Sequence, residues 1–339
     1  MQQGVEMMKV DNQATMTLKL GLPGLLRESL KIFHKNPKFI FFTFLTSIPL
    51  FCTMLPHEML FQRALMEAVA TLTVRTESTD SIDSPTYYAD EQLRTIEGLV
   101  WSMSHQFLKL ALLYLFPLHV CDLLSILATV DSASAIYAGE EGTDGVKEMV
   151  QRLITRTRWK GPFITSIFVL TMSAVILFEI IFIVALSYYA PGINLSELLY
   201  GLLNAALYAA CFLVLFKKWL EWSAVWNMGV VFSILGKRHG IEALELSAYF
   251  SNGSCRQLGF LLMLGLFVWN LGLRLSCFLL LHLVGRQGNQ WTEILATSAQ
   301  VSLMCLGNVF KWVTFMVYYY DCKNRFSEKK IHVEEASSV

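Results

Sequence analysis

Four charged side chains stand almost alone inside long apolar runs, and they are the residues best placed to do chemistry. They are Asp122, Glu179, Arg274 and Lys311. A charge in hydrocarbon is costly, so such residues usually pair with one another or line a path for an ion, a proton or a solute. Glu179 lies 18 residues after the start of its apolar run at Gly161, and Arg274 lies 17 residues after the start of its run at Gln257. Asp122 lies 8 residues before the end of its run at Val130, and Lys311 lies 9 residues before the end of its run at Tyr320. At about 1.5 Å of rise per residue, the depths match in two acid–base pairs, Glu179 with Arg274 and Asp122 with Lys311.

Two interpretations of these pairs stay open. In the structural interpretation, each pair neutralises its charges and fixes the register of two helices. In the functional interpretation, the pairs form a polar path through a helical bundle. A transport path usually brings more polar residues or broken helices in each span, and this sequence has few of either.

Sequence motifs of enzymes are absent. The 339 residues contain no HExxH, GxSxG, P-loop or GxGxxG pattern. His119 and His282 are the two histidines inside apolar runs, and their spacing is not that of metal ligands. The seven cysteines lack CxxC spacing, which favours small apolar core residues over disulfides or metal ligands. We therefore expect no enzyme, no cofactor, and no catalytic or metal-binding residue.

The elements that must position these charges are six apolar segments. Apolar residues make up 54% of the chain and charged residues 16%, against about 25% charged residues in ordinary soluble domains. The segments cover 39–56, 107–130, 161–188, 198–217, 257–284 and 294–320. Each is long enough to cross about 30 Å of hydrocarbon. The sequence thus predicts an all-α integral membrane protein with six transmembrane helices, and its net charge of zero gives no sign of a nucleic-acid partner.

One further apolar stretch, Trp219–Leu235, is open to two interpretations. It is either a seventh span or a continuation of the fourth helix along the membrane surface. Its three tryptophans favour the surface, because an indole prefers the half-wet membrane interface.

The distribution of basic residues predicts that both termini are cytoplasmic. With six spans, one face carries 20 lysines and arginines, whereas the opposite face carries only Arg63, Arg75, Arg94 and Arg286. Such a bias marks the cytoplasmic side. We accordingly expect a disordered cytoplasmic N-terminus at 1–20, an acidic outer loop at 57–98 and a cytoplasmic tail at 321–339. The endoplasmic reticulum and the plasma membrane both fit the span lengths.

Three cytoplasmic segments share the pattern of an amphipathic surface helix that leads into a transmembrane hairpin. They are Leu22–Lys35, Thr143–Thr157 and Gly240–Asn252. Their apolar stripes comprise Leu22, Leu25, Leu26, Leu30 and Phe33; Val146, Met149, Val150, Leu153 and Ile154; and Ile241, Leu244 and Ala248. A basic helix with one apolar face lies among lipid headgroups and prefers anionic lipid. We predict headgroup contacts for Arg152, Arg156, Arg158 and Lys160; the alternative is that each helix packs on its own bundle.

Two stretches of the sequence resemble known membrane proteins. Residues 25–33 read LLRESLKIF and residues 35–38 read KNPK, which resembles the start of plant multi-pass membrane proteins of uncharacterised function. Residues 240–244 read GIEAL, with Ser247, Gly253 and Gly259 after them. This part is similar to the membrane domain found beside bacterial glycerophosphodiester phosphodiesterases. The resemblance implies a six-helix membrane module without the phosphodiesterase activity, which belongs to a separate soluble barrel.

The expected function is that of a non-enzymatic membrane protein that organises lipids or protein partners at a cytoplasmic membrane face. Its expected partners are membrane lipids and other membrane proteins. The alternative is a small transporter or channel-like module that uses the intramembrane charges. A membrane-embedded enzyme is a third class, since a fold does not fix a function.

The predicted topology is tested by cysteine accessibility. A cysteine at Ser81 should react with an impermeant reagent from outside the membrane, whereas one at Ser337 should react only after permeabilisation. Labelling of both from outside would require an odd number of spans.

Overall fold

A computed structural model describes residues 20–78, 109–139, 146–155, 159–189, 195–236, 238–284 and 290–337. In these residues every regular element is a helix, which confirms the all-α class. The helices are α2 (Leu22–Lys35), α3 (Pro37–Ser78), the π-helical turn η1 (Tyr114–Leu118), α5 (His119–Tyr137), α6 (Val146–Thr155), α7 (Lys160–Tyr189), α8 (Leu195–Leu235), α9 (Ile241–Phe250), α10 (Ser254–Val284) and α11 (Gln290–Ser337). The short helices α2, α6 and α9 each precede a long helix.

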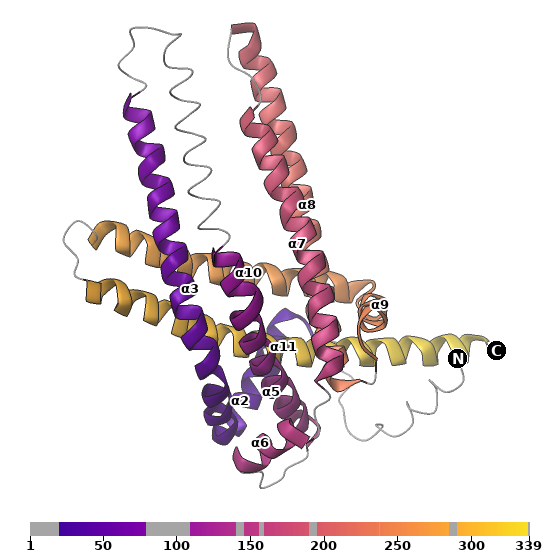
Figure 1. Cartoon of the computed structure of the whole chain (residues 1–339). Coiled ribbons are helices and arrows are strands. Elements are labelled where there is room, and N and C mark those ends of the chain that lie inside the picture. Colours follow the sequence, from indigo (N-terminus) through magenta and orange to yellow (C-terminus); the bar gives the residue numbers. More distant parts are fainter. Residues whose placement is uncertain are drawn as a thin grey trace.

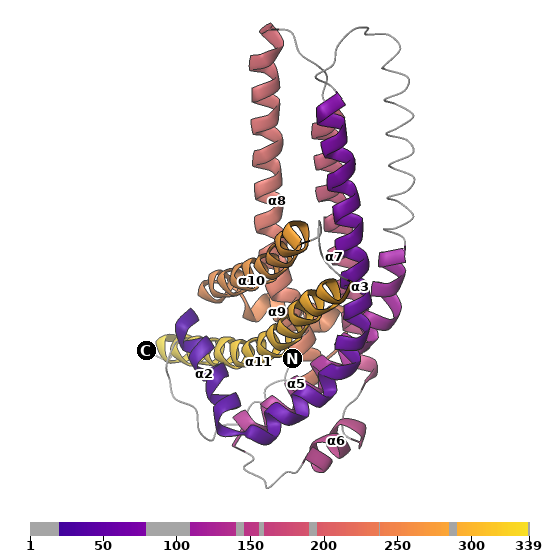
Figure 2. The same cartoon turned by 90° about the vertical axis from the view of Figure 1, so that its left-hand side faces the viewer.

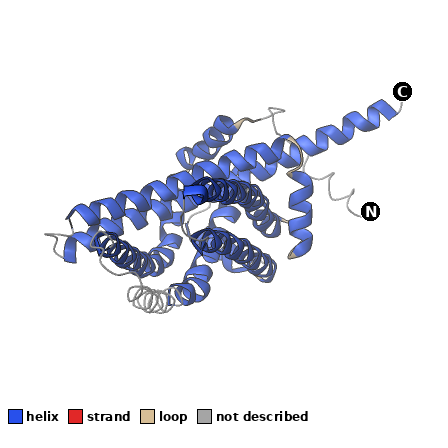
Figure 3. Cartoon of the chain, turned by 90° about the horizontal axis from the view of Figure 1, so that it is seen from above, coloured by secondary structure: helices blue, strands red, loops and turns tan. Residues whose placement is uncertain are grey.

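The long helices are not arranged as one parallel bundle. Helices α7 and α8 form a hairpin that rises in roughly the same direction as α3, whereas α10 and α11 lie side by side and cross them at a steep angle (Figures 1 and 2). Seen from above, α11 runs across the molecule and projects beyond it at the C-terminus (Figure 3). A bilayer normal that follows α7 and α8 therefore does not also follow α10 and α11.

Four helices among the described residues are long and apolar enough to cross a membrane. They are Pro37–Glu67, His119–Tyr137, Ser254–Leu283 and Trp291–Glu328. A shorter apolar helical stretch covers Lys160–Ile176 of α7. These lengths and compositions agree with an integral membrane protein.

Helix α11 is the centre of the packing. Every residue from Trp312 to Cys322 is buried except Tyr320, which is half-buried. A helix that is buried on all sides must be covered by several partners, and α11 contacts α2, α3, α5, α8, α9 and α10. Its inner half thus forms the axis on which the other helices pack.

Trp219–Leu235 continues the fourth apolar segment as one helix, as one of the two interpretations expects, and its placement at the membrane surface stays a prediction. The segment continues α8 without a break and enters the main hydrophobic core. Trp226 is 4% exposed, and Met228 and Val231 are fully buried, whereas Trp222 alone of the three tryptophans is exposed. An apolar stretch looks the same in sequence whether lipid or protein covers it, so the sequence alone does not show that this segment packs into the core.

The first transmembrane helix extends much further than the sequence predicts. Helix α3 passes through Pro49 and Pro56 and reaches Ser78, so the first part of the predicted outer loop is helical. Prolines are tolerated in membrane helices where nearby hydroxyl groups satisfy the freed carbonyls. The carbonyl that Pro49 frees is that of Leu45, whereas the Thr53 hydroxyl donates to the carbonyl oxygen of Pro49 itself at 3.0 Å.

Only Leu244 of the apolar stripe predicted for Gly240–Asn252 packs against α8, where its side chain lies beside Gly229. Ile241 is 55% exposed and Ala248 is also exposed, while Ala243 and Ser247 are fully buried. The Ser247 hydroxyl donates to the Val225 carbonyl oxygen of α8 at 2.6 Å. Small residues on this face of α9 let the helix lie close to α8, so volume decided the packing here more than hydrophobicity.

Gly259 marks the closest approach of α10 to its neighbours. A Cβ at this position would lie 2.8 Å from the Tyr318 hydroxyl oxygen of α11 and 3.0 Å from the Ala224 Cβ of α8. That hydroxyl donates to the Cys255 carbonyl oxygen at 2.8 Å in a buried hydrogen bond. The missing side chain thus lets three helices meet without displacing this bond.

We expect Gly259→Ala to lower the melting temperature of the purified protein, because the added methyl group displaces Tyr318. Overpacking of this kind costs about 1–3 kcal/mol. Gly265→Ala is the matched control on the same helix, since a Cβ there would meet nothing within 4 Å. The control should keep or raise the melting temperature, because alanine favours a helix over glycine by about 1 kcal/mol. Equal melting temperatures for the two variants would contradict this account.

Candidate functional site

Arg274 of α10 pairs with Glu58 of α3. The Arg274 Nε lies 3.2 Å from Glu58 Oε1, and its Nη2 donates to Glu58 Oε2 at 3.2 Å. The Glu58 side chain is fully buried, whereas 39% of the Arg274 side chain is exposed. The guanidinium carbon also lies 5.0 Å from the ring centroid of Phe61, a cation–π distance. The pair therefore ties the middle of α10 to α3.

The predicted pairing of Glu179 with Arg274 is wrong. Glu179 lies on an exposed part of α7, and α7 packs mainly against α8 and α9. The position of Arg274 deep in its helix correctly indicated that it needs an acidic partner. The depth does not, however, show which helix supplies that partner. Glu58 was missed because the predicted span ended before it, at Pro56.

Gln300 of α11 completes the environment of Glu58. Its side-chain amide Nε2 donates to Glu58 Oε1 at 2.9 Å, and both side chains are buried. Gln62 lies one turn from Glu58 on α3, and Thr297 lies one turn from Gln300 on α11. Both are at most 1% exposed. Three helices thus bring one carboxylate, one guanidinium and three uncharged polar side chains to a single junction.

A second polar cluster surrounds Asp122 of α5. The Asn308 amide donates to Asp122 Oδ1 at 2.8 Å, and the Trp312 indole donates to Asn308 Oδ1 at 3.1 Å. The Lys311 ammonium lies near Asp122 and 4.4 Å from the ring centroid of Trp312. The predicted partners are therefore neighbours, but their ion pair does not form within 4.0 Å. Asn308, which sequence reasoning missed, holds the carboxylate instead.

Of the residues predicted to contact lipid headgroups, the structure describes Arg152 and Lys160. Arg152 lies on α6, and Lys160 begins α7 with its side chain exposed. Arg156 and Arg158 lie outside the described residues. Their contact with lipid stays a prediction.

A large apolar groove lies between α2, α3, α10 and α11. Its volume is about 1090 Å³. From α2 it is lined by Leu22, Leu26, Leu30 and Phe33, which share one helical face. Ser47 and Phe51 of α3, Trp269 of α10 and Phe310 of α11 belong to the residues that form its other walls.

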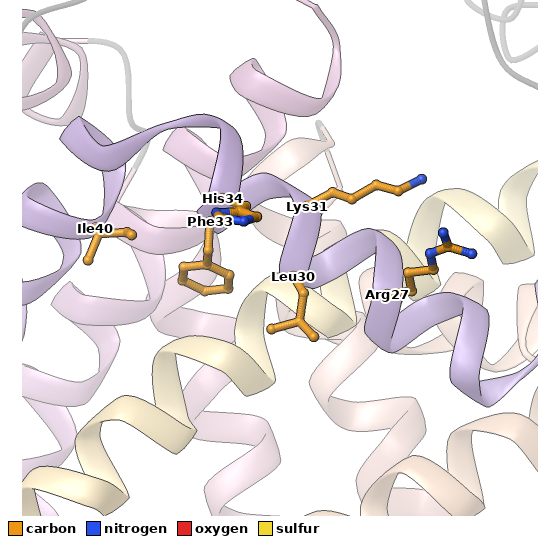
Figure 4. A pocket seen from close by; sticks show the side chains of 6 residues that line it. All are labelled: Arg27, Leu30, Lys31, Phe33, His34 and Ile40. Atoms are coloured by element: carbon orange, nitrogen blue, oxygen red, sulfur yellow. The ribbon is translucent and has the colours of Figure 1, made fainter.

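A basic rim borders this groove. An adjoining hollow of about 480 Å³ shares Leu30, Phe33 and Ile40 with the groove. Arg27, Lys31 and His34 complete its lining, and the close-up shows the Arg27 and Lys31 side chains reaching out from α2 (Figure 4). The Lys31 ammonium contacts Glu28 Oε1 at 2.6 Å.

The described residues hold no cluster of three or more His, Cys, Asp or Glu side chains that could bind a metal ion. The seven cysteines are free, and four of them are buried. His119 Nε2 lies 2.9 Å from the Ser166 hydroxyl oxygen, so this histidine joins α5 to α7.

Residues 10–336 match a family model described as Domain of unknown function (DUF8558). The chain belongs to this family. The match to DUF8558 spans the groove and both polar clusters. No curated protein and no solved structure matches the chain. The resemblance to plant membrane proteins and to the bacterial phosphodiesterase membrane domain therefore stays a prediction for this DUF8558 chain.

Glu58 and Gln300 are the site residues that sequence reasoning missed. One signal could have found them. Glu58 and Gln62 have the i, i+4 spacing of a shared helical face, as Thr297 and Gln300 have i, i+3 spacing. Two polar faces within apolar helices predict a contact between them.

Arg274→Met should destabilise the protein by about 3 kcal/mol, the lower end for a broken buried pair, because Arg274 is partly exposed. Glu58→Gln should rescue much of this loss in the double variant, since it removes the uncompensated carboxylate. The measurement is thermal or denaturant unfolding in detergent, analysed as a double-mutant cycle. Glu179→Gln is the control and should not rescue. A rescue by Glu179→Gln equal to that by Glu58→Gln would overturn the pairing.

Proposed function

We propose that this protein is a non-enzymatic, multi-pass membrane protein that binds and organises lipids at a cytoplasmic membrane face. The observation that carries the proposal is the apolar groove beneath α2 with its basic rim. Acyl chains require an apolar surface that is shielded from water, and phosphate headgroups are bound by arginine and lysine. The groove and the rim offer the two environments side by side.

The different environments of the faces of α2 support this function. Leu25, Ser29 and Ile32 are buried against the bundle, while the neighbouring face lines the groove. Arg27 and Lys31 are offset by one residue from Leu26 and Leu30, so they lie at the edge of the lining face. One short helix thus anchors itself with one face and presents an apolar surface and a charged edge with the rest.

The charge of the rim selects the kind of lipid. Lys31 shares its charge with Glu28, but Arg27 adds a second cation, and Lys35 and Lys38 follow directly as exposed residues. The local surplus of positive charge favours an anionic headgroup, by about 1 kcal/mol for each basic residue near the membrane surface.

The membrane arrangement belongs to the same proposal. It has six spans, α2, α6 and α9 as cytoplasmic amphipathic helices, and both termini in the cytoplasm. The basic residues on one face support it through the positive-inside rule. The membrane is that of the endoplasmic reticulum or the plasma membrane, and other membrane proteins are further partners.

A small transporter is the second candidate function. The observation that favours it is the polar junction around Glu58, where uncharged polar side chains are buried beside an ion pair. Intramembrane ionisable residues mark transport paths in many membrane proteins. A liposome flux assay with Arg274→Met as the comparison separates this function from lipid binding.

Lipid binding is tested by the affinity of the purified protein for phosphatidylserine relative to phosphatidylcholine, measured by native mass spectrometry. Arg27→Gln with Lys31→Gln should weaken phosphatidylserine binding by about 2 kcal/mol, roughly 30-fold. Lys217→Gln with Lys323→Gln removes the same charge away from the groove and should change little. Equal losses in both double variants would show a general charge effect and would contradict a site at α2.

A further inference from the structure

Polar side chains form a ladder on the facing sides of α3 and α11. At one end, Arg63 Nε lies 3.1 Å from Glu293 Oε1, and 58% of the Arg63 side chain is exposed. At the other end, Glu58 and Gln300 are hydrogen-bonded and buried. The contacts run in opposite directions along the two chains, from Glu58 to Arg63 on α3 and from Gln300 to Glu293 on α11, so Gln62 and Thr297 lie between them. The ladder leads from an exposed ion pair to a buried carboxylate.

The middle of the ladder holds polar atoms that lack a partner. Gln62 Nε2, Gln62 Oε1 and Gln300 Oε1 make no hydrogen bond with any described residue, and the Thr297 hydroxyl lies beside the Cys277 thiol, a weak hydrogen-bonding group. An unsatisfied buried polar group costs about 1–3 kcal/mol. Several of them within two helical turns indicate a ligand that binds there.

The chemistry of these atoms selects the ligand. They include both donors and acceptors, so the ligand must donate and accept hydrogen bonds. A metal cation would be repelled by Arg274, and an anion would be repelled by Glu58. Water satisfies all of these requirements and commonly fills polar interior sites.

We propose that the α3–α11 ladder is a water path through which protons reach Glu58 from the Arg63 end. This function goes beyond lipid binding and uses different residues. In the exchange step, a proton passes from the water chain to a Glu58 carboxylate oxygen, and the same oxygen later returns it. Arg274 keeps its own protons, and no other bond forms or breaks.

The surroundings of Glu58 limit the path to one side. The ionisable groups around it are Arg274 and Cys277 of α10, His57 and Arg63 of α3, Glu293 of α11 and Tyr114 of η1. Beyond Gln300, the buried residues on α11 toward Asp122 are apolar, with Val301 at 0%, Met304 at 4% and Cys305 at 7% exposure. The path therefore ends at Glu58.

Proton access is tested by infrared spectroscopy of the full-length protein in lipid nanodiscs. In Arg274→Met, the uncompensated Glu58 carboxylate takes up a proton, and its C=O stretch is identified by its loss in the Glu58→Gln double variant. Transfer to D₂O should shift this band quickly. Adding Gln62→Leu and Thr297→Val should slow the shift by at least about tenfold, because both replacements remove water partners. An unchanged exchange rate would overturn the proposal.

A second measurement uses the unmodified protein and two cysteines of equal burial. Cys277 lies beside Thr297 and near Glu58 and is 6% exposed, whereas Cys305 lies beyond Gln300 and is 7% exposed. Hydroxyl radicals made from bound water by X-rays oxidise adjacent side chains, and peptide mass spectrometry reads the result. Cys277 should be oxidised faster than Cys305. Equal oxidation of the two cysteines would contradict a water path at this level.

The melting temperature of the Gln62→Leu, Thr297→Val variant tests independently whether water fills the junction. If the junction is hydrated, Gln62→Leu and Thr297→Val remove hydrogen bonds to water and should lower the melting temperature. If it is dry, the same replacements remove unsatisfied polar atoms and should raise it. A rise would count against the proposal even if the infrared variants failed to fold.

Discussion

The burial of Glu58 is the constraint on which the membrane domain depends. A carboxylate in a low-dielectric interior persists only if a counter-charge and hydrogen-bond donors reach it from other elements. Arg274 supplies the charge from α10 and Gln300 supplies a donor from α11. Helix α3 is thereby held in register with α10 and α11, which lie more than 200 residues later in the chain. Further toward the C-terminus of α11, the Asn308 amide holds the Asp122 carboxylate in the same way and thereby joins α5 to the other three helices.

The groove depends on a second charged contact at the other end of α11. Arg325 bonds to Asp321 at 2.8 Å, to the Leu20 carbonyl oxygen at 2.6 Å and to the Ser254 hydroxyl at 3.3 Å. It thereby joins the start of α2 and the start of α10 to α11. This clamp adds to the buried face of α2, where Leu25, Ser29 and Ile32 pack against the bundle, in holding the helix over the groove.

The sequence predicts positions along the helices better than it predicts neighbours. Residues 22–35 were expected to be helical and form α2 with the same limits, because their apolar spacing, Pro23 and Asn36-Pro37 are local signals. Arg274 was expected to need a partner, and it has one. The identity of that partner depends on which helices touch and on how each is rotated, and neither quantity is encoded in local periodicity. The correct partner, Glu58, was left out of the predicted span because a proline followed by His57 and Glu58 resembles the end of a transmembrane helix.

The groove and the water path share α3, α10 and α11 but no side chain. On α10, Trp269 faces the groove, and Arg274, five residues further, pairs with Glu58. On α11, Leu306 lines the groove, while Gln300 meets the carboxylate. Side-chain changes at one site therefore leave the chemistry of the other intact, but a shift of any of these helices must alter both. A lipid in the groove would support the helix spacing that the buried ion pair requires, so the two proposed functions would be linked through packing alone.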